Sequence, residues 1–147
     1  MSNPNTRSAL ANYKQVGVQS GVDNATPHSL IQMLMAGALE KISAAKGFME
    51  RGEIAPKGEH ISWAISIIEG LKTSLDKSVG GEIAENLEFL YIYMSRRLME
   101  ANKNNDPALL DEVSGLLAQI KSGWDAIPQD IIEKHAAGQK LDVASGS

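Results

Sequence analysis

The spacing of the apolar residues is the feature that most limits what this chain can fold into. Between clusters of Pro, Gly and Asn, apolar residues recur three or four positions apart, and no segment alternates between apolar and polar residues as a strand does. A period near 3.6 residues is that of an amphipathic α-helix. The chain is therefore predicted to be all-α.

Start and stop signals divide this pattern into four long helices. Thr26 and Asp106 each precede a proline, which suits a capping side chain followed by the first helical residue. Gly52 and the pair Gly80 and Gly81 are expected to end the first and second helices, and residues 54–58 are expected to form a loop. The apolar stripes run over residues 31–49, 61–79, 83–101 and 109–124. A short fifth helix is expected after Pro128, ending near Gly138.

The short connections between the stripes determine how the helices should be arranged. Helices of about 18 to 24 residues joined by a few residues return antiparallel, which predicts an up-down-up-down four-helix bundle. We expect residues 1–138 to form this single bundle domain, with residues 1–23 as a mobile N-terminal segment. Residues 139–147 are small and polar and are expected to form a flexible tail.

Composition narrows the classes of function. The chain has 147 residues, no Cys and a formal charge of -4, so clustered positive charge for nucleic acid or an anionic membrane is not expected. Residues 1–14 lack the apolar core of a secretory signal, and no run approaches the ~20 apolar residues of a membrane span. We expect a soluble cytoplasmic protein that neither inserts into membranes nor binds nucleic acid.

The sequence contains no residue pattern typical of a catalytic or metal-binding site. The three histidines, His28, His60 and His135, lack a second His or a Glu at the spacing that puts two ligands on one helical face. The acidic residues that follow Gly81 suit the first turns of a helix, where they complement its dipole. We therefore expect no enzyme activity, no metal and no cofactor.

Two of the predicted helices carry more apolar surface than one core contact needs. On the second helix the apolar arc widens to roughly 200°, where about 100° suffices for burial. The third helix likewise has apolar residues beside its core stripe of Ile83, Leu87, Leu90 and Met94. Two interpretations stay open, a broad core contact with neighbouring helices or a binding groove for another chain. The candidate groove residues are Trp63, Ile67, Leu71, Phe89, Ile92 and Tyr93.

Motifs along most of the chain resemble the flagellin-specific export chaperones of the FliS type. The resemblance rests on Tyr13, on ATPHSLIQMLMAGALEKISAAK at residues 25–46, on GGEIAENLEFLYIYMSRRLMEAN at residues 80–102 and on LLAQIKSGW ending at Trp124. This chain departs from the family's usual tyrosine and aspartate at Met35 and Ala36.

The resemblance implies an antiparallel bundle that binds the disordered C-terminal segment of flagellin. Such a chaperone prevents premature polymerisation and delivers its client to the cytoplasmic domain of the flagellar export gate. The groove residues would then be flagellin contacts, and Leu10 and Tyr13 would cover the groove and dock on the gate. We hypothesise that client binding displaces the N-terminal segment and presents it to the gate.

Two other classes of function remain as alternatives. One is a general helical adaptor or scaffold that binds another regulator, and the other is a small-ligand or metal-dependent bundle enzyme. The oligomeric state of the free chain is left open by the sequence.

Overall fold

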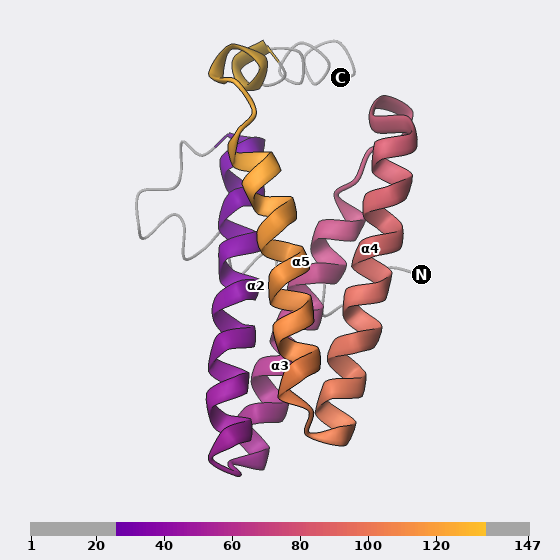
Figure 1. Cartoon of the computed structure of the whole chain (residues 1–147). Coiled ribbons are helices and arrows are strands. Elements are labelled where there is room, and N and C mark those ends of the chain that lie inside the picture. The colour runs from indigo at the N-terminus through magenta and orange to yellow at the C-terminus, as the bar shows by residue number, and fades with distance from the viewer. Residues whose placement is uncertain (1–25, 135–147) are drawn as a thin grey trace, which may run out of the picture.

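The computed structural model describes residues 26–134 as a bundle of four long helices (Figure 1). These are α2 (Pro27–Glu50), α3 (Ile54–Thr73), α4 (Lys77–Asn104) and α5 (Pro107–Asp125), and residues 129–134 form a further helical stretch. This described part of the chain contains no strand. The prediction of an all-α fold is confirmed.

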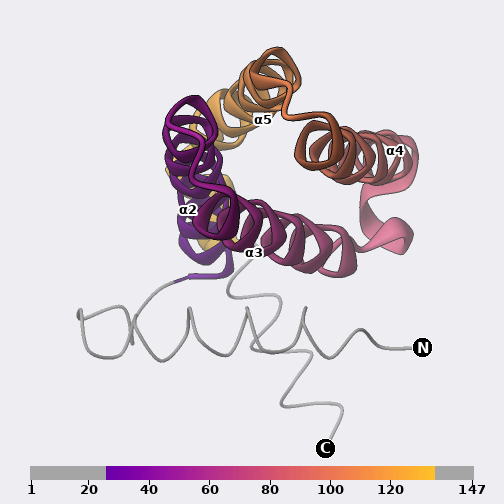
Figure 2. The same ribbon diagram turned by 90° about the horizontal axis from the view of Figure 1, so that it is seen from below.

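Consecutive helices run in opposite directions and lie side by side (Figures 1 and 2). Helix α3 contacts α2 and α4, while α5 contacts α4 and closes the ring against α2. This is the predicted up-down-up-down arrangement, in which short connections keep neighbours in sequence adjacent in space.

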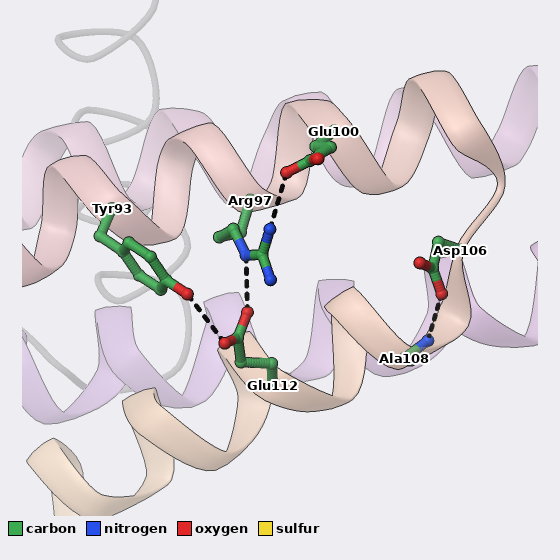
Figure 3. Close-up of polar contacts among 6 residues, drawn as sticks. All are labelled: Tyr93, Arg97, Glu100, Asp106, Ala108 and Glu112. Atoms are coloured by element: carbon green, nitrogen blue, oxygen red, sulfur yellow. Dashed lines mark hydrogen bonds and ion pairs between the residues drawn. The ribbon is translucent and has the colours of Figure 1, made fainter.

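Side-chain caps begin α2 and α5 where the sequence predicted them. The Thr26 hydroxyl accepts a hydrogen bond from the Ser29 backbone amide at 3.0 Å, and Pro27 follows as the first helical residue. At α5, an Asp106 carboxylate oxygen accepts from the Ala108 amide at 3.0 Å (Figure 3). Each cap satisfies an amide that has no partner inside the helix.

Two boundaries differ from the prediction. Residues 54–58 are not a loop but the first turns of α3, where Pro56 is tolerated because amides in a first turn have no intrahelical acceptor. Helix α3 also ends earlier, at Thr73, and α4 begins at Lys77 after an Asp76 cap. The glycine pair therefore does not end α3. Gly81 instead forms a kink inside α4, with φ 53° and ψ -125°.

The core is built from all four helices, and it contains two of the six candidate groove residues. Ile67 and Leu71 are 0% and 1% exposed and belong to the central cluster, which for these two residues is the broad core contact that the sequence left open as the alternative to a groove. Ile65 and Leu75, expected at the centre of the stripe, lie only partly buried at its edge. A buried face that contains Ile67 and Leu71 and one that contains Ile65 and Leu75 both fit a helical period. The contacts of α3 with α2 and α4 decide which of the two is buried.

Candidate functional site

The end of α5 is fastened to the start of α2. The rings of His28 and Trp124 stack with centroids 4.9 Å apart, and His28 Nε2–H donates to the Trp124 carbonyl oxygen at 2.8 Å. In return, Trp124 Nε1–H donates to the His28 carbonyl oxygen at 3.0 Å. One turn further along α2, the Gln32 amide donates to Asp125 at 2.7 Å. These contacts hold the last turn of α5 beside α2.

The beginning of α5 is fastened to α4 instead. Glu112 accepts a hydrogen bond from the Tyr93 hydroxyl at 2.8 Å and from Arg97 Nε at 2.7 Å (Figure 3). Hydrogen bonds from Arg97 and then Tyr93 hold the pKa of Glu112 below its ordinary value, and the bond to Glu112 raises the pKa of Tyr93. Arg97 also pairs with Glu100 at 2.8 Å. The network lies in the second half of α4.

Because α5 contacts α4 at its beginning and α2 at its end, it does not cover the inner face at the start of α4. In Figure 1 the start of α4 stands away from α2 and from the end of α5. Ile83 is 71% exposed, although it lies on the same helical face as Met94, which is fully buried. Leu87 and Leu90, between them, are partly buried against the core. We call Ile83, Leu87 and Leu90 the inner strip.

The inner strip corrects part of the sequence interpretation. Ile83 was assigned to the core stripe of the third helix, but in the structure it is exposed to solvent. Helix α4 has 28 residues and α5 has 19, so some of the inner face of α4 has no residue of α5 opposite it. This difference in helix length is the signal that could have identified the strip. Because the end of the second helix was predicted at Gly80 and Gly81, the predicted third helix was too short and the difference in length was missed.

The six groove residues expected from the sequence are not brought together. Ile67 and Leu71 are in the core, as described above. Trp63 is 43% exposed on α3 and lies under the Lys41 ammonium of α2, 4.0 Å from the ring centroid.

The other three expected residues lie on α4 but not on its inner strip. Phe89 is 69% exposed, and Ile92 is half-buried on the same side of α4 as Phe89. Tyr93 lies beside α5 through its bond to Glu112. Leu10 and Tyr13, the expected cap and gate contacts, lie outside the described residues.

Residues 9–131 match the family described as flagellar protein FliS. The chain belongs to this family. Flagellar secretion chaperone FliSB of Pseudomonas aeruginosa is 54% identical over 119 residues, which cover 81% of this chain and 94% of that protein. The flagellar secretion chaperones FliS of Salmonella typhimurium and Vibrio cholerae are 49% and 44% identical, covering 83% and 84% of this chain and 91% of each relative.

Membership of the FliS family confirms the resemblance seen in the motifs and assigns the chain to the flagellar secretion chaperones. Over residues 26–134, no group of three or more His, Cys, Asp or Glu side chains is placed to hold a metal ion. None of the four described FliS helices is long and apolar enough to cross a membrane. The feature of this FliS bundle that most resembles a binding site is the exposed apolar face of α4.

Proposed function

We propose that this chaperone binds the C-terminal segment of flagellin in the cytoplasm, with the inner strip of α4 as its anchor. The observation that carries the proposal is the 71% exposure of Ile83 on a face that is buried further along the same helix. Leu87 and Leu90 continue the strip toward the core. A client helix that packs against these residues would cover the part of the inner face of α4 that α5 does not reach.

The physical basis is the docking of an amphipathic helix onto an apolar face. Side chains at Ile83, Leu87 and Leu90 recur at i, i+4 and i+7, which is the spacing that a partner helix can cover continuously. Burying an isoleucine side chain contributes about 1.5 to 3 kcal/mol, while ordering a disordered segment costs about 2 to 5 kcal/mol. Several such contacts are needed, so the client would extend beyond the strip onto neighbouring surfaces.

Binding in this way would explain a chaperone activity without an energy source. An apolar client surface that lies against α4 is not available for polymerisation, so the chaperone prevents assembly by competition. We further propose that the loaded complex is delivered to the export gate, with Leu10 and Tyr13 contributing to docking as the family resemblance implies.

The test is calorimetric titration of a flagellin C-terminal peptide into the wild-type chain and two variants. Ile83→Asp places a charge on the inner strip, and Ile54→Asp makes the same change at an equally exposed residue, 69% against 71%, at the start of α3. Neither side chain contributes to the core, so both variants should keep their helical circular dichroism.

We expect Ile83→Asp to weaken binding by about tenfold or more, because a buried charge would replace an apolar anchor. Ile54→Asp should bind like the wild-type chain. Equal affinity of all three proteins would show that flagellin does not use the inner strip.

A further inference from the structure

The helical stretch at residues 129–134, which we call the end stretch, carries an apolar side chain and a charge that the bundle does not use. Ile131 is 52% exposed and is not among the residues packed against the core. Lys134 lies three residues later on the same side of the stretch and is exposed. We propose that the end stretch folds over the inner strip of α4 when no client is bound, with Ile131 packed against Ile83.

The end stretch lies at the end of the bundle where the inner strip begins. Helices α4 and α5 are antiparallel, so α5 finishes where α4 starts, and Figure 1 shows the end stretch, in yellow, at this end. Residues 126–128 connect it to α5. Three extended residues span about 10 Å, which is comparable to the distance of about 8 to 10 Å between packed helices. A change in this connection alone can bring the end stretch to α4, while α5 stays fastened to α2.

Little holds the end stretch in its present position. The amides of Ile131 and Ile132 donate to the Pro128 carbonyl oxygen at 3.1 and 3.2 Å. Within residues 26–134, no hydrogen bond or salt bridge joins the end stretch to α2, α3 or α4. A segment held only by local contacts moves at a small cost in free energy.

The charge beside Ile83 is complementary to the charge of the end stretch. Glu82 is exposed in the first turns of α4, and neither Glu82 nor Lys134 forms a salt bridge with another described residue. In the proposed contact, Lys134 pairs with Glu82 while Ile131 covers Ile83. An exposed ion pair contributes little to stability, so the two isoleucines provide most of the attraction and the charges fix the orientation.

This contact regulates the same site to which we assigned the client, and in that respect it rests on the proposed function. The apparent affinity for a client falls by the fraction of the chaperone that is open. Because one isoleucine and one ion pair form a small contact, we expect the open and closed forms to be within about tenfold of each other. The end stretch then covers Ile83 in the empty chaperone, and flagellin displaces it.

The first test is disulfide trapping in the full chain, which contains no Cys. Ile83→Cys combined with Ile131→Cys should form an intramolecular disulfide under mild oxidation without flagellin, because thiols bond only when their Cβ atoms approach to about 4 Å. Glu85→Cys combined with Ile131→Cys is the matched control, since residue 85 is exposed but lies about 200° further around α4. Its disulfide should form at least about tenfold more slowly, as measured by mass spectrometry without reduction.

Charge reversal tests the orientation of the contact. Glu82→Lys and Lys134→Glu should each slow the trapping of residues 83 and 131 by about threefold, because each places like charges together. The variant with both reversals exchanges the two charges and should recover the original rate.

The second test is calorimetric titration of the flagellin C-terminal peptide into Ile131→Asp, which has no added Cys. This variant should bind about threefold to tenfold more tightly than the wild-type chain, because the closed form is lost. Ile83→Asp, in contrast, weakens binding because it damages the site itself.

Several results would overturn the proposal. Equal trapping rates for the 83–131 and 85–131 pairs would do so, as would rates that the charge reversals leave unchanged. Faster trapping of residue 83 by Leu10→Cys than by Ile131→Cys would assign the cover to the N-terminal segment instead. Trapping is measured without flagellin, so it tests closure independently of the client. Trapping as expected, with the flagellin affinity of Ile131→Asp unaltered, would confirm closure and contradict the proposed client site.

Discussion

His28 and Trp124 join the start of α2 to the end of α5 through one ring stack and two hydrogen bonds. Replacing Trp124 with Ala should lower the free energy of unfolding by about 2 to 4 kcal/mol, because packing and both polar contacts are disturbed. Trp124→Phe keeps a ring but removes the indole donor, so the loss should be about 1 kcal/mol. Urea unfolding followed by circular dichroism measures both. A loss for Trp124→Ala no larger than for Trp124→Phe would contradict this role.

Glu112 should make the stability of the chain depend on acidity. Hydrogen bonds from Arg97 and Tyr93 hold its pKa below the ordinary value of 4.5, so the unfolded chain takes up this proton first as the pH falls. Its contribution is therefore complete above pH 4.5 and is lost as the pH falls through the pKa of the folded state. Glu112→Gln should be less stable at neutral pH and should lose less stability on acidification. Unfolding curves from pH 7 to about 3 would show this, with the exposed Glu59→Gln variant behaving like the wild type.

At the scale of the helix, Gly81 determines where α4 bends. Its φ of 53° combined with ψ of -125° strongly disfavours residues with a side chain. Gly81→Ala should therefore lower stability by about 2 kcal/mol. Gly115 in α5 is the matched control, since a Cβ there meets nothing within 4 Å and its helical conformation suits alanine. Gly115→Ala should raise stability by about 0.5 to 1 kcal/mol. Increased helicity and unchanged stability of Gly81→Ala would instead show that α4 can straighten.

The helices themselves were predictable, because the signals that make them are local. Thr26 and Asp106 with their following prolines are contiguous in sequence, and both begin helices as expected. The rotation of a helix is not a local property. Ile67 and Ile65 differ by two positions on α3, and only the contacts with α2 and α4 bury the first more deeply than the second. For this reason the expected groove residues were scattered among the core, the α2–α3 seam and α4.

At the scale of the whole molecule, the inner strip exists because α5 is attached to two different helices. Glu112 ties its beginning to α4, and Trp124 ties its end to α2. Neither attachment can be inferred from the apolar pattern, since each joins residues from different helices through polar atoms. The sequence therefore predicted a surplus of apolar surface on the second and third helices but not its cause, which is that α5 does not cover the inner face of α4 at its start (Figures 1 and 2).

Site-specific cross-linking tests the central claim most directly, and the chain suits it because it contains no Cys. Ile83→Cys, Ile54→Cys and Met99→Cys, each labelled with the same photoreactive maleimide, would be mixed with flagellin and irradiated. The account predicts that the label at residue 83 attaches to the C-terminal segment of flagellin, while the labels at 54 and 99, which lie away from the inner strip, do not. Flagellin adducts at 54 or 99 with none at 83 would contradict it.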